Sequence, residues 1–179
     1  MTEPNDESPR LWVDADACPR EVRELVFRAA ARRGLRVTLV ANAWQNVPPV
    51  SGVDLVVVAS GDDKADDHIV AAARRTDLVV TGDVPLAARI VAKGLTAVSP
   101  RGEEYTEATI GERLAGRDLM EALRGAGLAT GGPAPFSEKD VRQFANVLDR
   151  YITRWRPLPG PRMPTLAETC GRCPRSGAP

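Results

Sequence analysis

Cysteine and histidine are scarce in this chain, which limits the scaffolds and sites that it can build. The 179 residues include three cysteines, Cys18, Cys170 and Cys173, and one histidine, His68. An odd number of scattered cysteines does not form a disulfide framework. A structural zinc site normally takes four Cys or His ligands, and the CGRC segment is far along the chain from Cys18 and His68. We therefore expect free thiols rather than a zinc site.

Long apolar runs and an excess of charge of one sign are also absent. No apolar run approaches the roughly 20 residues of a membrane span, and the opening segment MTEPNDESPR is too polar to resemble a signal peptide. The 24 basic and 24 acidic side chains give a formal net charge of zero, so no global field attracts nucleic acid or an anionic membrane. We expect a cytoplasmic protein without a membrane partner, in which any nucleic-acid partner binds a local patch.

What the chain does contain is enough apolar sequence for one core. Hydrophobic residues make up 43% and charged residues 27%, which are ordinary values for a globular domain. The polar start and the proline-rich end are typical of disordered segments. We predict a disordered N-terminus over residues 1–10, one folded domain over 11–156 and a disordered tail over 157–179.

Short apolar runs alternate with amphipathic segments in the middle of the chain, a pattern typical of an α/β fold with a mostly parallel sheet. The pattern predicts strands over residues 11–13, 36–41, 55–59, 78–81 and 96–98, of which the third is apolar enough to be covered on both faces. It predicts crossover helices over residues 19–33, 65–75 and 85–93. After Pro100 it predicts only helices, over 106–123, with a break near Gly111 or Gly116, and over 137–155 with Ser137 as N-cap.

Aspartates gather where the predicted strands end. Asp14 and Asp16 follow the first strand, Asp66 and Asp67 begin the helix after the third, and Asp83 follows the fourth. In open parallel sheets, ligands bind outside the carboxyl ends of the strands. Carboxylates that converge repel one another until a proton or a cation neutralises the group. Oxygen ligands without His or Cys favour Mg²⁺ or Mn²⁺ over zinc.

Each aspartate also has a plainer explanation. Aspartates after strands are common helix N-caps and turn formers, and Asp83, which precedes Val84 and Pro85, fits that role. For a single residue the capping explanation is the better one. For three acidic groups at one edge of a sheet, a shared metal site is the better hypothesis.

Several motifs, in order along the chain, carry a family resemblance. VDADACP, the AD pair in KADDHIV, TGDVPLA, PRGEEYT and GRDLMEALRGAGLATGGP together resemble the YaiI/YqxD family of uncharacterised bacterial proteins. The resemblance spans about residues 11–155. That family is placed among the PIN-like domains, a superfamily rich in metal-dependent ribonucleases.

The resemblance implies a PIN-like three-layer fold with strand order 3-2-1-4-5 and additional C-terminal helices. The order of the strands then reverses between Asp16 and Asp83, where the open-sheet rule puts ligands. Matched by motif, the catalytic and metal-binding set of PIN-type nucleases falls on Asp14, Asp66 and Asp83, with Asp16 beside them. The implied activity is hydrolysis of phosphodiester bonds with Mg²⁺ or Mn²⁺, in RNA or another single-stranded nucleic acid.

Further residues have weaker claims to the site. Asn42, after the second strand, is a candidate polar ligand, and Asp67, Asp62 and Asp63 are candidate carboxylates. Arg101 and Tyr105, just after the fifth strand, are candidates for contacting a phosphate and stacking on a base, with a loop-fixing role equally open. His68 is a candidate proton shuttle or simply a surface residue.

Two alternatives to a nuclease stay open. A strand that ends in DxD resembles the nucleophile motif of haloacid-dehalogenase phosphatases, with Asp14 attacking and Asp16 acting as acid. However, Ala87 stands where the GDxxxD motif of that family needs a second carboxylate. The other alternative is a non-catalytic module that binds metal or RNA.

Overall fold

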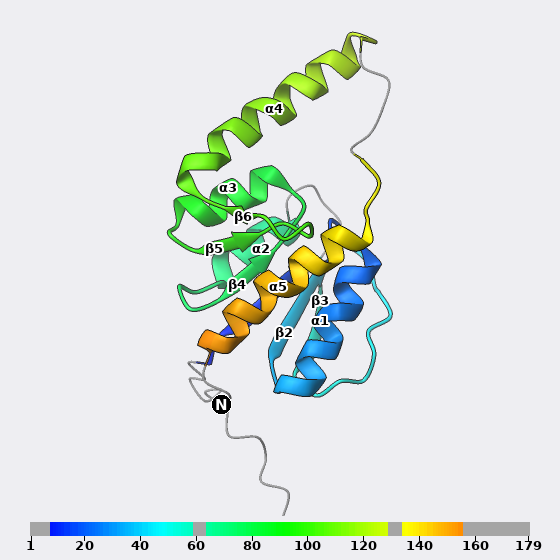
Figure 1. Ribbon diagram of the computed structural model, residues 1–179, viewed down its shortest axis with the longest axis vertical. Coiled ribbons are helices and arrows are strands. Elements are labelled where there is room, and N and C mark those ends of the chain that lie inside the picture. Colours follow the sequence, from blue (N-terminus) through cyan, green and yellow to red (C-terminus); the bar gives the residue numbers. More distant parts are fainter. Residues whose placement is uncertain (1–7, 59–63, 129–133, 156–179) are drawn as a thin grey trace, which may run out of the picture.

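The computed structural model describes residues 8–58, 64–128 and 134–155 of the chain (Figure 1). Most of the predicted N-terminal tail, the acidic pair Asp62 and Asp63, and the C-terminal tail with Cys170 and Cys173 lie outside the described residues. Arg10, which we assigned to the N-terminal tail, is already the first residue of a strand.

One six-stranded sheet forms the centre of the molecule, and its order is β3-β2-β1-β4-β5-β6. All neighbours pair in parallel except β5 and β6, which are antiparallel. The order 3-2-1-4-5 is the one that the resemblance implied, and the architecture is consistent with a PIN-like three-layer fold. The strands are β1 (Arg10–Asp14), β2 (Arg36–Ala41), β3 (Val53–Val57), β4 (Leu78–Val80), β5 (Thr96–Val98) and β6 (Glu104–Tyr105).

The helices begin and end close to the positions that their capping residues predict. Gly34, at a φ of 63°, ends the first helix in the left-handed conformation that glycine adopts without strain. Asp83, Thr106 and Ser137 cap the third, fourth and fifth helices with their side chains. The helices are α1 (Arg20–Arg33), α2 (Lys64–Ala72), α3 (Val84–Ala92), α4 (Glu107–Gly125) and α5 (Glu138–Arg154).

Helices cover both faces of the sheet because successive strand residues point to opposite faces. Leu11 and Val13 of β1 pack with α1 and α5 in one hydrophobic cluster, whereas Trp12 packs with α2 and α3 in the other. The two α-helical layers with the sheet between them are visible in Figure 1. Because β1 and β4 are adjacent and parallel, their carboxyl ends lie at the same end of the sheet. We call this end, with its aspartates, the acidic edge.

The third strand differs from its prediction in position and in burial. It begins two residues earlier than predicted, so that Asp54 lies inside it rather than before it. It is an edge strand, and Val57 is 47% exposed, so it is not covered on both faces as its apolar sequence led us to expect. An edge position exposes side chains that the same sequence would bury in the centre of a sheet.

The region after Pro100 contains a strand that was not predicted and a helix that is not broken. The two-residue β6 pairs with β5 through a tight turn at Gly102, where a Cβ would lie 2.5 Å from backbone atoms of Gln143 and Phe144. α4 runs through Gly111 and Gly116 without interruption, so the predicted break was wrong. Its first half packs on α3, and the rest extends away from the body (Figure 1). Within the described residues, no helix has the length and apolar character that crossing a membrane requires.

Candidate functional site

Asp14 ends β1 and Asp83 follows β4, on either side of the point where the order of the strands reverses. β1 and β4 are adjacent in the sheet, although a large part of the chain separates them. Thr81, fully buried at the end of β4, connects the two aspartates: its Oγ1 donates to Asp14 Oδ2 over 2.7 Å and accepts from the backbone N–H of Asp83 over 2.9 Å. Thr81, which the sequence analysis did not single out, therefore links the Asp14 carboxylate to the backbone at Asp83.

Gly82 allows the two turns to approach one another. A Cβ at this position would lie 2.7 Å from the backbone oxygen of Ala17, closer than a carbon atom normally comes to an oxygen. Thr81, Gly82 and Asp83 form the turn after β4, and Ala17 belongs to the turn after β1. The TGD motif thus combines a bridging hydroxyl, a close contact and a carboxylate.

Asp14 is a carboxylate in an environment that disfavours its charge. Its side chain accepts hydrogen bonds from Thr81 and from the backbone N–H of Ala17, and the residue is only 4% exposed. Burial raises its pKa above the ordinary value of 3.8, the two hydrogen bonds oppose that rise, and the nearby charge of Asp16 adds to it. Binding of a proton or of a cation would therefore stabilise the Asp14 side chain.

Asp16 lies nearby but is directed toward the loop after β2. Its Oδ2 accepts from the backbone N–H of Asn42 over 2.8 Å, and its Oδ1 accepts from Gln45 Nε2 over 3.0 Å. Asn42 therefore contacts the acidic edge through its backbone rather than through its side chain. Asp16 fastens this loop while its charge still acts on Asp14.

Asp66 and Asp67 lie in the first turn of α2, on the sheet face covered by α2 and α3. Asp66 is half-buried, whereas Asp67 is exposed and forms an ion pair with Arg89 of α3, 2.5 Å apart. The contact of Asp67 joins two neighbouring helices. The assignment of Asp66 to the site, which the motif resemblance implied, stays a prediction.

Asp83 caps α3, as the plainer explanation predicted. Its Oδ1 accepts from the backbone N–H of Leu86 over 3.3 Å. A capping oxygen retains a further lone pair, and the second oxygen of the carboxylate has no contact in this cap. Capping and metal binding by Asp83 are therefore compatible.

No group of three or more His, Cys, Asp or Glu side chains within the described ranges is close enough to hold a metal ion. The donors at the strand ends are nevertheless all oxygens, the kind that Mg²⁺ and Mn²⁺ prefer. The buried, charge-strained Asp14 has a reason to bind a cation, so the residues fit such an ion in chemistry. The metal site stays a prediction.

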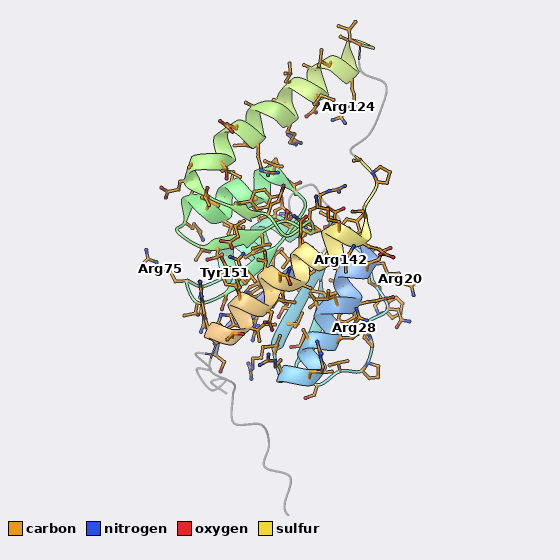
Figure 2. All side chains as sticks on the ribbon, in the orientation of Figure 1. Arg20, Arg28, Arg75, Arg124, Arg142 and Tyr151 are labelled. Carbon is orange, nitrogen blue, oxygen red and sulfur yellow. The ribbon has the colours of Figure 1, made fainter. Side chains whose placement is uncertain are left out.

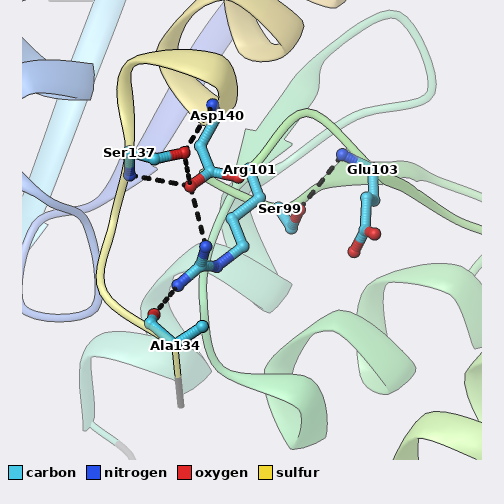
Figure 3. Close-up of polar contacts among 6 residues, drawn as sticks. All are labelled: Ser99, Arg101, Glu103, Ala134, Ser137 and Asp140. Carbon is cyan, nitrogen blue, oxygen red and sulfur yellow. Dashed lines mark hydrogen bonds and ion pairs between the residues drawn. The ribbon is translucent and has the colours of Figure 1, made fainter.

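Arg101 and Tyr105 make contacts that match their loop-fixing alternative. Arg101 donates to Asp140 over 2.8 Å and to the backbone oxygen of Ala134, as Figure 3 shows. Tyr105 is 7% exposed, its hydroxyl lies 3.5 Å from the backbone oxygen of Thr81, and the Arg113 guanidinium covers its ring. Burial raises the pKa of the Tyr105 hydroxyl. Arg101 therefore joins the turn between β5 and β6 to the start of α5 and the segment before it, and Tyr105 packs against the end of β4.

His68 contacts a core aromatic ring, and Cys18 is a buried thiol. The imidazole of His68 meets the ring of buried Trp12 edge-on, with 6.0 Å between ring centroids. Cys18 is a buried free thiol, and burial raises its pKa to about 12, so it is not a nucleophile at neutral pH.

Three features escaped the sequence analysis. Thr81 directly precedes Gly82 and Asp83 at a strand end, so its position was a usable signal. Trp44, an aromatic residue in the loop after β2, was another, and it is 75% exposed. The hydrogen bond that Gln45 makes to Asp16 had no signal in the sequence.

The fold and its acidic strand ends define a mostly parallel α/β protein with a candidate site at the switch point. The model of the family described as "Uncharacterized BCR, YaiI/YqxD family" matches residues 12–154. The chain belongs to this family.

Its curated relatives extend the match to nearly their whole length. A UPF0178 protein of Maridesulfovibrio salexigens is 50% identical over 145 residues, which are 81% of this chain and 96% of that protein. UPF0178 proteins of Yersinia pestis strain Pestoides F and Yersinia pseudotuberculosis serotype O:3 are 50% identical over 147 residues, covering 82% of this chain and 97% of theirs. No solved structure matches the chain.

Proposed function

We propose that this protein is a nuclease that hydrolyses phosphodiester bonds in single-stranded RNA and depends on Mg²⁺ or Mn²⁺. The observation that carries the proposal is the pair Asp14 and Asp83, joined through Thr81 at the switch point of a parallel sheet. The PIN-like placement of the family supports it by analogy. The proposal includes the cytoplasmic location expected from the sequence.

Asp14 and Asp83 would hold the cation, and Asp66 and Asp16 would add oxygens around it. When bound, Mg²⁺ or Mn²⁺ supplies an activated water near neutral pH and offsets charge on the phosphate oxygens. The chain itself orients the ligands: Thr81 fixes the Asp14 carboxylate by a hydrogen bond and also holds the backbone at Asp83. A fixed carboxylate needs no reorganisation when the substrate arrives.

Cleavage of a labelled single-stranded RNA by purified protein tests the proposal. We expect cleavage with Mn²⁺, none with EDTA, and none for Asp14→Asn or Asp83→Asn. Thr81→Val should lower the rate about 10- to 100-fold, as loss of a hydrogen bond to a ligand typically does. The matched control is Asp54→Asn, because Asp54 is exposed on β3 and its loss should leave the rate unchanged.

Thermal unfolding provides a second readout of the same prediction. At a hundredfold excess over Kd, Mn²⁺ should stabilise the wild type by about 2.7 kcal/mol, which is roughly 5–11 °C for a domain of this size. The aspartate variants should lose most of this gain, and they should be neutral or stabilised in EDTA. Equal cleavage by wild type and Asp83→Asn, with no shift across millimolar Mn²⁺, would remove the proposal.

One observation favours a non-catalytic binding module as the second candidate. Asp83 caps α3 and Asp67 pairs with Arg89, so two of the acidic residues already have structural partners. A module predicts binding of Mn²⁺ or RNA without hydrolysis. The phosphatase alternative predicts instead a covalent aspartyl phosphate on Asp14, which trapping with a phosphate-ester substrate would reveal.

A further inference from the structure

A cavity of about 1020 Å³ lies between α1 and the loop after β2, next to the acidic edge. Figure 1 shows this loop, residues 42–52, running alongside α1. Asp16 lines the cavity, and its charge also raises the pKa of Asp14. Its volume is at the upper end of the roughly 300–1,000 Å³ of small-molecule sites.

Basic, amide and apolar side chains line most of this cavity, and the carboxylates of Asp16 and Glu24 also belong to its walls. α1 provides Arg20, Arg23 and Phe27 on one face of the helix. Arg20 pairs with Glu24 through its Nε at 2.7 Å and is otherwise exposed. The loop provides the amides of Gln45 and Asn46, followed by Val47, Pro48 and Pro49. Cations, amides and flat apolar surface are respectively the partners of phosphate, base edges and base faces.

The loop is held in place although it has no regular secondary structure. Asp16 accepts hydrogen bonds from the backbone of Asn42 and the side chain of Gln45, the residues on either side of Ala43 and Trp44. Arg23 Nη1 donates to Gln45 Oε1, which ties the loop to α1. Val47 and Val50 pack against the core. The cavity wall is therefore formed before any ligand binds.

Trp44 is displayed by this clamped loop. It is 75% exposed, whereas Trp12 is buried in the core. Exposing so large an aromatic surface to water is unfavourable. Tryptophan side chains commonly stack on unpaired bases. Trp44 directly precedes Gln45 and Asn46, which line the cavity, so this residue lies where the loop begins to form the cavity wall.

We infer that Trp44 and this cavity bind one or two unpaired nucleotides of single-stranded RNA, beside the phosphate that reaches the acidic edge. The inference rests on the proposed function for its substrate class. Trp44 stacks on a base, Arg20 and Arg23 contact the neighbouring phosphate, and Asn46 meets the base edge. A duplex keeps its bases paired and stacked, so it binds less well.

Binding of 12-residue labelled oligouridine and oligoadenosine, in EDTA, tests the inference by fluorescence anisotropy. Trp44→Ala should weaken binding about 5- to 100-fold, the range that loss of one stacked base gives. Trp44→Phe should restore most of the affinity because the ring remains. Binding should also quench the fluorescence of the wild type and not that of Trp44→Phe.

Two control variants match the substitutions. Leu119→Ala removes an exposed apolar side chain from α4, far from this loop in Figure 1. Arg20→Gln should weaken binding, whereas Arg28→Gln should not, because Arg28 lies farther along α1, as Figure 2 shows, and does not line the cavity. Both tryptophan variants should keep the wild-type circular dichroism, since Trp44 is outside the core.

The outcomes separate this inference from the proposed nuclease. RNA binding that depends on Trp44, without cleavage in Mn²⁺, would support the binding site and remove the nuclease. Cleavage with the same KM in wild type and Trp44→Ala would remove the binding site and leave the nuclease. The inference would also be overturned if oligouridine or oligoadenosine failed to bind, or if a duplex bound with the same affinity as the single strand.

Discussion

Asp14 is the residue whose protonation should report on the site. Its pKa is raised mainly by burial and further by Asp16, while Thr81 and Ala17 oppose the rise. The folded protein therefore binds a proton at Asp14 more readily than the unfolded chain does. Stability from this group is fully present below about pH 3.8 and is lost as the pH rises through the higher folded pKa.

Asp14→Asn removes this dependence on pH. In EDTA, we expect its free energy of unfolding relative to the wild type to increase from pH 4 upward and to level off above the folded pKa of Asp14. Urea unfolding at several pH values measures it, and Asp54→Asn should give a flat difference. A flat difference for Asp14→Asn as well would show that the carboxylate is not strained.

At this scale the sequence predicted the strand ends at which Asp14 and Asp83 lie, but not the contacts that hold them there. Asp14 and Asp83 follow adjacent strands, and strand ends can be read from apolar runs. The hydroxyl of Thr81 and the clamp between Asp16 and Gln45 depend on side-chain directions in three dimensions. Such contacts join residues that no local pattern relates.

At the scale of elements, one carboxylate joins the start of α5 to the turn between β5 and β6. Asp140 accepts from Ser137 at the start of α5 and from Arg101 in the turn between β5 and β6 (Figure 3). The hydrogen bonds from Ser137, and then the charge of Arg101, hold the pKa of Asp140 below 3.8. Its stabilising contribution is present above pH 3.8 and is lost as the pH falls through the lower folded pKa.

Asp140→Asn should therefore lower the melting temperature at pH 7, and the gap from wild type should narrow as the pH falls toward 3. Arg101→Gln should change the melting temperature in the same direction. Asp149→Asn is the matched control on α5, because Asp149 makes only an exposed pair with Arg33, at 3.4 Å. Circular dichroism measures each transition. A gap of constant size from pH 7 to pH 3 would contradict the role assigned to Asp140.

Helices that have both a periodic pattern and a capping residue were predicted closely from the sequence. α1 and α5 have both, and their predicted bounds agree with the structure to within one residue. β6 has only two residues and no pattern, and its pairing depends on the turn at Gly102 packing against α5. The shift of β3 has the same kind of cause, since its register is fixed by pairing with β2.

At the scale of the whole molecule, a formal net charge of zero limits how RNA can bind. Counterion release makes the affinity fall with salt in proportion to the number of phosphates that cations neutralise. A chain with balanced charges has no net positive field that would add to this effect. The cations available at the proposed site are Arg20 and Arg23, which line the cavity.

Two contacts predict a shallow dependence of affinity on salt. For a single strand, the slope of log K against log salt concentration is about −0.7 per phosphate, so we expect about −1.4 in EDTA. Between 50 and 200 mM salt the affinity should then fall only about sevenfold. Arg20→Gln should reduce the slope by about 0.7, because it removes one phosphate contact. Trp44→Ala should weaken binding equally at every salt concentration and leave the slope unchanged, because stacking releases no counterions. Anisotropy titrations at four salt concentrations measure both quantities. A slope of about −4 or steeper would mean that RNA lies along an extended basic surface, and the cavity beside Asp16 would then not be its main binding site.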